Sequence, residues 1–288
     1  MAALGWAAFG GVHHLALSIV TVVRRDFAGL ERTLASLGRL DHRVEVVVIE
    51  GDDTIWAESE RLQDRFRQSL PSLRWLRQPD NGIYAAMNKG VMMAAGRWVW
   101  FLNAGDSLTS PTSLTSLVDL LGAVADGSEW VLGNTNVRDS TGTLLRVKPA
   151  ADYSAAQLLL GTYTPCHQAV ITSRAALARH GGFDTRYSVA ADYRLFLQLV
   201  SGGCQPEPLA FDVDFLHGGT SHQARARSVR EYARARSETL GRRPAAGAQD
   251  SLRSVARSLV PNPVAQARAR SKERGRAVSM GRSTTRTP

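Results

Sequence analysis

The first hundred residues alternate short apolar runs with longer segments of helical periodicity. The apolar runs lack the polar alternation of a half-exposed strand, which is typical of strands covered on both faces in a parallel sheet. Trp98, Trp100 and Phe101 in the fourth run are expected in the core. The pattern predicts an α/β domain in which helices flank a mostly parallel, Rossmann-like central sheet. The predicted strands cover residues 15–23, 44–50, 73–78 and 97–103, and the predicted helices cover residues 30–40, 54–70 and 82–96.

Acidic side chains follow three of the four predicted strands. Glu50, Asp52 and Asp53 end the second strand, Asp80 follows the third, and Asp106 follows the fourth. In parallel sheets, ligands bind beyond the carboxyl ends of the strands. Carboxylates gathered on one rim repel each other unless a cation or hydrogen-bond donors bind there. The base, ribose and diphosphate of a nucleotide, together with a divalent metal ion, meet that need.

Several protein classes are excluded by missing motifs. No Gly-x-Gly-x-x-Gly follows the first strand, and no Gly-x-x-x-x-Gly-Lys-Ser/Thr occurs, so a dinucleotide fold and a P-loop enzyme are not expected. Cys166 and Cys204 are the only cysteines and lack metal-ligand spacing. No apolar run is long enough to span a membrane, and the first residues lack a signal-peptide pattern. We therefore expect a cytoplasmic protein.

The net charge of +9 comes from the C-terminal tail. From residue 241 onward, eleven basic residues stand against two acidic ones, whereas residues 1–240 hold 24 of each sign. The tail is rich in Ala, Ser, Gly and Arg, which predicts disorder. A solvated extension fits this composition, and so does a peripheral contact with anionic lipid headgroups at the inner face of the membrane. We expect no nucleic-acid partner for the neutral remainder.

Four segments, taken in order, resemble a known enzyme family. They are SIVTVVRRDFAGLERTLASL (18–37), VEVVVIEGDDT (44–54), QPDNGIYAAMNKGVMMAAGRWVWFLNAGD (78–106) and HQAVITSRAALARHGGFDTRYSVAADYRLFLQL (167–199). Together they resemble family 2 glycosyltransferases of the GT-A fold, in particular bacterial enzymes of polysaccharide and glycolipid biosynthesis with an Asn-Ala-Gly-Asp metal motif. The resemblance covers residues 15 to 220 and implies a nucleotide-sugar donor.

The resemblance implies a metal and donor site at the strand ends. Asp106 would hold Mg²⁺ or Mn²⁺, and His217 is a second candidate ligand. Asn103 replaces the first acid of the usual Asp-x-Asp pattern, and Gly105 stands where many relatives carry an acid. One carboxylate together with phosphate oxygens and waters still completes the octahedral coordination of the ion. The resemblance favours a UDP-sugar: Glu50 falls where the family usually has an Asp that accepts the uracil N–H, and a longer carboxylate can do the same with shifted geometry. The alternative interpretation of residues 103–106 is an ordinary turn, because Asn, Gly and Asp favour turns. The implied donor-binding residues are Thr21, Val23, Arg24, Glu50, Asp80, Asn88, Lys89 and Asn103.

The second half of the resemblance implies the acceptor side. Asp192 begins an apolar-periodic helix, where an acid is stabilised by the helix dipole, so a purely structural acid is one interpretation. In the family this position matches the general base that takes the proton of the acceptor hydroxyl. His167 is expected to begin a strand and either line the acceptor cleft or make a structural hydrogen bond. The implied reaction is inverting transfer to a polysaccharide, glycolipid or lipid-linked acceptor.

The expected organisation is a lead-in, one catalytic domain and a tail. The lead-in is residues 1–14, the catalytic domain is residues 15–240, and the tail is residues 241–288. Within the domain, residues 15–110 form the nucleotide-sugar half and residues 111–240 the acceptor half. Two alternatives remain: a degenerate sugar-nucleotide-binding adaptor, and a nucleotidyltransferase. The latter would be expected to carry a Gly-rich basic loop after the first strand, which is missing here.

Overall fold

The structure is a computed structural model that describes most of the chain between residues 15 and 241. The predictions for residues 1–14, for Asp52, Asp53 and Asp80, and for the tail from residue 242 onward lie outside the described residues. Among the residues described, no helix has the length and apolarity needed to cross a bilayer. The described segments are residues 15–38, 40–51, 56–79, 82–109, 113–217 and 225–241.

The first four strands form a parallel half-sheet. They are β1 (Leu17–Val23), β2 (Val44–Glu50), β3 (Leu73–Arg77) and β4 (Trp98–Phe101). They lie in the order β3-β2-β1-β4, and Leu17 pairs with Val44 on one side and with Trp98 on the other. Every residue of β1, β2 and β4 is buried. These strands are therefore covered on both faces, as the apolar runs predict.

The later strands make the sheet mixed. They are β5 (Ser107–Leu108), β6 (Trp130–Arg138), β7 (Leu144–Lys148), β8 (Val170–Ser173) and β9 (Glu207–Leu216). The sheet continues from β4 through β8, β6 and β9 to β5, and β7 pairs with β6 off this path. β8 is antiparallel to both β4 and β6, whereas β6 and β9 are parallel. The α/β sheet flanked by helices is confirmed, and its second half adds antiparallel pairs.

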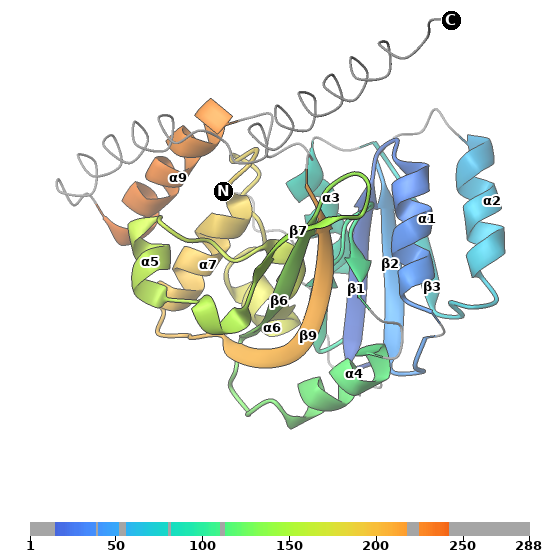
Figure 1. Cartoon of the computed structure of the whole chain (residues 1–288), viewed down its shortest axis with the longest axis horizontal. Helices are drawn as coiled ribbons and strands as arrows, with labels where there is room; N and C mark the ends of the chain where they lie inside the picture. The colour runs from blue at the N-terminus through green and yellow to red at the C-terminus, as the bar shows by residue number, and fades with distance from the viewer. Residues whose placement is uncertain are drawn as a thin grey trace, which may run out of the picture. The chain divides into compact units, whose positions relative to one another are not determined.

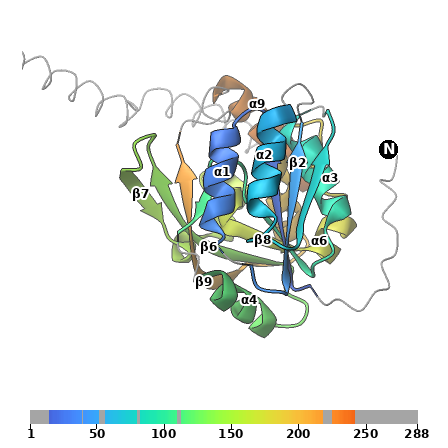
Figure 2. The ribbon, with the colours of Figure 1, turned by 90° about the vertical axis from the view of Figure 1, so that its right-hand side faces the viewer.

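Helices flank the sheet (Figure 1). They are α1 (Phe27–Ser36), α2 (Trp56–Phe66), α3 (Ile83–Met93), α4 (Ser113–Ala123), α5 (Ala155–Leu160), α6 (Arg174–Arg179), α7 (Ala191–Ser201) and α9 (Arg225–Leu240), with 3-10 turns η1 (Ala150–Asp152) and η2 (His167–Ala169). α1 begins where the Asp26 carboxylate accepts the Gly29 N–H at 2.7 Å. α1 and α2 lie side by side (Figure 2), and α9 packs against α7.

The aromatic residues of β4 belong to the core. Trp98, Trp100 and Phe101 are all buried, as predicted. The Trp100 ring packs edge-on against Phe211 of β9, and Phe101 packs edge-on against Phe183. The Trp100 indole also donates to the carbonyl of Gln168 at 2.6 Å. β4 is thereby fixed to the second half of the sheet just before its carboxyl end.

Candidate active site

The segment after β4 is a tight turn that continues the strand pairing. The Ala104 N–H still donates to the Val22 carbonyl at 3.2 Å, and the Asp106 N–H then turns back to the Asn103 carbonyl at 3.0 Å. Gly105 has φ +102°, a backbone conformation that other residues rarely adopt. The turn therefore places the Asn103 and Asp106 side chains at the end of a buried central strand.

Thr33 of α1 holds this turn by hydrogen bonds. The sequence did not identify Thr33 as a site residue. Its hydroxyl accepts from the Gly105 N–H at 3.0 Å and donates to the Asp106 carbonyl at 2.7 Å. The residue is buried. Because a hydroxyl can both donate and accept, one side chain satisfies two backbone groups of the turn.

The Asp106 carboxylate lies at the junction of the two half-sheets. It is 5% exposed, and it accepts from Gln168 Nε2 at 2.8 Å and from the Leu216 N–H at 3.3 Å. Burial raises the pKa of Asp106 to about 6, against the lowering effect of the Gln168 hydrogen bond. A buried carboxylate with two donors still has free lone pairs, and a cation beside it would favour its ionised form.

Gln168 is oriented by a thiol that sequence reasoning treated only as a redox marker. Cys166 Sγ donates to Gln168 Oε1 at 2.7 Å. Burial raises the pKa of Cys166 to about 12, so the thiol stays protonated. The amide oxygen of Gln168 thus faces Cys166 and its NH₂ group faces Asp106.

His167 connects the turn after β4 to helix α7. Its Nε2 lies 3.0 Å from Asn103 Nδ2, and its Nδ1 lies 3.5 Å from Asp192 Oδ2. An amide nitrogen can only donate, so Nε2 accepts and the proton of a neutral imidazole sits on Nδ1, toward Asp192. The residue lies in η2, and β8 begins only at Val170, so the predicted strand start at residue 167 is wrong.

Asp192 lies in the first turn of α7 and is 9% exposed. Its Oδ1 accepts from the Tyr193 N–H at 2.8 Å and lies 3.1 Å from the hydroxyl of Tyr84 on α3. Burial and the Asp192 charge raise the pKa of Tyr84 well above its usual value, so the phenol remains a donor. The structure therefore brings Asn103, His167, Asp192 and the unpredicted Tyr84 into one cluster.

The nucleotide side of the prediction centres on Glu50. Its Oε2 accepts from Ser59 at 2.6 Å, Trp75 at 2.9 Å and Arg77 at 3.2 Å. Its Oε1 is buried and has no hydrogen-bond partner among the described residues, and the same holds for the hydroxyl of Thr21 on β1. Unsatisfied buried acceptors at strand ends fit a site that receives N–H or O–H groups of a ligand.

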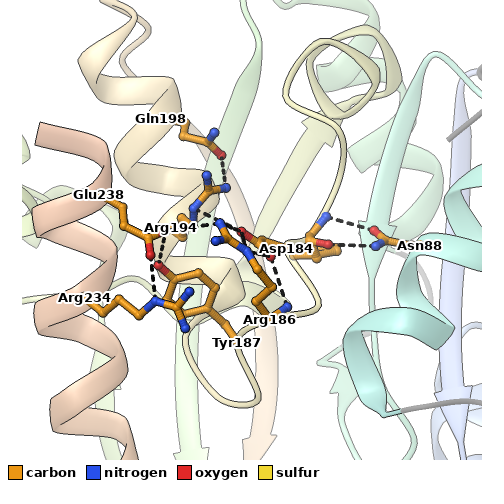
Figure 3. Close-up of polar contacts among 9 residues, drawn as sticks. Asn88, Asp184, Arg186, Tyr187, Arg194, Gln198, Arg234 and Glu238 are labelled. Carbon is orange, nitrogen blue, oxygen red and sulfur yellow. Dashed lines mark hydrogen bonds and ion pairs between the residues drawn. The ribbon is translucent and has the colours of Figure 1, made fainter. Parts of the chain in front are cut away.

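Two other candidate donor residues have hydrogen-bond partners within the protein. The Asn88 amide donates to and accepts from the backbone of Phe183, both at 2.8 Å, so it links α3 to the acceptor half (Figure 3). Lys89 Nζ donates to the Pro79 carbonyl at 2.9 Å. Val23 is buried and Arg24 is exposed. Asn88 thus has a structural role that the sequence did not predict.

The arrangement fits a divalent ion that takes most of its ligands from substrate and water. No cluster of three or more His, Cys, Asp or Glu side chains suited to a metal occurs in the part of the chain that the structure describes. Asp106 offers a carboxylate, and the buried Oδ1 of Asn103 has no partner among the described residues. The His217 N–H donates to the Arg138 carbonyl at 2.7 Å, and the preceding peptide contacts Asp106. Mg²⁺ commonly binds through one or two carboxylates plus phosphates and waters.

Comparison with known proteins identifies the family. The family model for glycosyl transferase family 2 matches residues 18–167. An uncharacterized glycosyltransferase of Mycobacterium tuberculosis is 30% identical over 187 residues, which make up 63% of this chain and 68% of that protein.

Two solved structures share the fold. Staphylococcus aureus TarS in complex with UDP has a TM-score of 0.55 at 16% identity, covering 79% of this chain and 71% of that one. The mannosyltransferase PcManGT of Pyrobaculum calidifontis, in complex with GDP-Man and Mn²⁺, has a TM-score of 0.57 at 15% identity, covering 92% and 80%. Both likenesses concern the fold alone. From the family match and the fold together, the chain belongs to glycosyl transferase family 2 and is a glycosyltransferase with the GT-A architecture.

Proposed function

We propose that this enzyme transfers a sugar from a nucleotide-sugar donor to an acceptor hydroxyl with inversion at the anomeric carbon. One observation carries the proposal: the path of contacts from Asn103 through His167 to Asp192, which runs beside the Asp106 carboxylate. A leaving-group site and a candidate base are thereby held in one cluster. Single displacement needs both, on opposite sides of the reacting carbon.

Asp192 is proposed as the general base. Its carboxylate takes the proton of the acceptor hydroxyl as that oxygen attacks the anomeric carbon. The Tyr84 hydroxyl and the Tyr193 N–H hold Oδ1, and His167 faces Oδ2. These contacts fix the side chain and occupy both lone pairs of Oδ1, so that one lone pair of Oδ2 is left for the acceptor.

The donor is proposed to lie along the ends of β1, β2 and β4. Glu50 Oε1 and the Thr21 hydroxyl are buried acceptors without partners among the described residues, and they would receive donors of the base and ribose. Val23, Arg24, Asp80 and Lys89 remain proposed neighbours of the nucleotide. A UDP-sugar is favoured, and TarS, a protein of the same fold, binds UDP.

Asp106, assisted by Asn103 and with His217 as a further candidate, would hold Mg²⁺ or Mn²⁺. When bound, such an ion would neutralise the charge that develops on the departing diphosphate. PcManGT, also of this fold, binds Mn²⁺ together with its donor. The acceptor is proposed to be a carbohydrate or a lipid-linked hydroxyl.

Substitution of the two carboxylates tests the proposal. Release of nucleoside diphosphate from a panel of UDP- and GDP-sugars is measured with Mn²⁺, with water as the acceptor. We expect Asp192→Asn to slow release by about 10²–10⁴-fold with unchanged donor affinity. Asp106→Asn should instead weaken the Mn²⁺-dependent affinity for the nucleotide in calorimetry. An Asp192→Asn enzyme with wild-type turnover would overturn the assignment of the base.

A further inference from the structure

Helix α7, which carries Asp192, lacks a cap of its own. Its N-cap residue is Ala190, whose side chain makes no hydrogen bond. The amide groups at a helix N-terminus have no partners within the helix and must find acceptors elsewhere. Since Asp192 lies in this first turn, whatever holds the turn also holds the carboxylate.

Glu231 of α9 supplies an acceptor for the N-cap amide of Ala190 and for the two amides before it. Its Oε2 accepts the N–H groups of Ser188 at 3.0 Å, Val189 at 2.8 Å and Ala190 at 3.0 Å. Its Oε1 accepts from the Ser188 hydroxyl at 2.7 Å. A carboxylate that gathers successive peptide N–H groups in front of a helix is favoured by the positive end of the helix dipole. One side chain of α9 therefore holds the backbone that leads into α7.

The contacts continue from Glu231 to Asp192 through one peptide. In the peptide that joins Val189 to Ala190, the Ala190 N–H donates to Glu231 Oε2 at 3.0 Å and the Val189 carbonyl accepts from the Tyr84 hydroxyl at 2.9 Å. The same hydroxyl lies 3.1 Å from Asp192 Oδ1. Val189 is thus held from one side by α9 and from the other by α3, and Tyr84 is shared between this peptide and the carboxylate.

We propose that Glu231 is a positioning residue for Asp192, which it acts upon through the Val189 peptide and Tyr84. This inference rests on the proposed function, in which Asp192 is the base. Glu231 does not touch the reacting atoms. It fixes the distance between the base and the acceptor oxygen, and the rate of proton transfer depends steeply on that geometry.

The same helix offers a matched control in Glu238. This residue also joins α9 to the segment before α7: it accepts from the Tyr187 hydroxyl at 3.0 Å, Arg186 at 3.1 Å and Arg234 at 2.7 Å (Figure 3). These bonds are made to side chains and end at Tyr187. None reaches the peptides that directly precede Ala190. A loss of general packing between α7 and α9 should therefore affect both glutamates, whereas a loss of positioning should affect only Glu231.

The experiment compares Glu231→Gln with Glu238→Gln in the full-length chain. Turnover is measured as nucleoside diphosphate release with Mn²⁺, from the UDP- or GDP-sugar that the wild type hydrolyses fastest. We expect Glu231→Gln to lower kcat at least tenfold with the donor KM within about twofold, because the base moves while donor contacts stay. Glu238→Gln should keep both constants near wild type. Hydrogen exchange, which needs no turnover, should speed up at the amides of residues 188–193 only in Glu231→Gln.

Each outcome decides the inference. Equal losses of kcat in both variants, or equal exchange at residues 188–193, would mean that Glu231 only supports the packing of α7 against α9. Either result would overturn the positioning role. Wild-type kcat in Glu231→Gln, with Asp192→Asn inactive, would overturn the positioning role and leave the proposed base intact. Full activity in Asp192→Asn would instead overturn the proposed function, whatever Glu231 does.

Discussion

At the scale of single residues, the turn after β4 depends on the backbone of Gly105. Its φ of +102° lies in a region where a Cβ is strained. Space is not the constraint, because the nearest atom to an added Cβ would be Asp26 Oδ2 at 3.7 Å. The cost of a larger residue is therefore a cost of backbone conformation. The Gly105 N–H is also bound by Thr33, so the turn has little freedom to relax.

Gly105→Ala should consequently lower the free energy of unfolding by about 1–3 kcal/mol, measured by urea denaturation. Gly122→Ala is the matched control. Gly122 lies in α4, with no atom within 4 Å of an added Cβ and no positive φ. Alanine there should stabilise the protein by about 0.5–1 kcal/mol, because glycine is a poor helix former. A neutral Gly105→Ala variant would show that the turn tolerates another conformation.

At the scale of elements, the junction of α7 and α9 contains carboxylates that are held ionised. Burial opposes the ionisation of Glu231, but the hydrogen bonds from Ser188, Val189 and Ala190 together lower its pKa. The hydrogen bond from Arg234 lowers the pKa of Glu238. Both groups have a usual pKa of 4.5. The contact between the two helices is therefore coupled to pH.

The sign of this coupling gives a prediction for acid stability. A group whose pKa is lower in the folded state stabilises the protein above its usual pKa, and the contribution is lost as pH falls through the folded value. The urea midpoint should therefore decline as pH falls below 4.5. The double variant Glu231→Gln/Glu238→Gln should be less stable at neutral pH and show a shallower decline. Parallel pH profiles for variant and wild type would contradict this assignment.

At the scale of the whole molecule, charge is unevenly distributed along the chain. Residues 1–240 carry equal numbers of basic and acidic residues, and residues 241–288 carry the entire excess of +9. An anionic membrane surface attracts such a segment by about 1 kcal/mol for each basic residue close to it. Salt screens this attraction.

The full-length chain should accordingly float with phosphatidylglycerol vesicles at low salt and dissociate at high salt. Vesicles of phosphatidylcholine alone are the control and should not retain it. Equal flotation with both lipids, or no flotation with either, would contradict the hypothesis that the tail binds anionic membrane surfaces.

The parallel half of the sheet could be predicted because each of its strands is marked by a short pattern within its own residues. Uninterrupted apolar runs identified β1, β2 and β4, and the position of Asp106 followed from the end of β4. The acceptor half carried less local signal. β6 pairs with β7 and β8 in antiparallel orientation and with β9 in parallel orientation. No periodicity in the sequence specifies these partners or their orientations.

The side-chain partners within the site could not be predicted for the same reason. His167 lies 64 positions from Asn103 in the sequence, and Tyr84 lies 108 positions from Asp192. Such contacts depend on how the two half-sheets meet. Gln168 and Cys166 sit beside His167, yet nothing in their types or spacing indicates that they orient Asp106.

Helix α3 belongs to the nucleotide-sugar half by sequence, yet two of its side chains complete the other half. Asn88 is bonded to the backbone of Phe183, and Tyr84 reaches Asp192. A chimera that joins the first hundred residues of this enzyme to the remainder of a relative would therefore inherit mismatched partners at both points. We expect an exchange of halves between relatives to keep both contacts only if α3 is exchanged together with the segment from Phe183 to Tyr193.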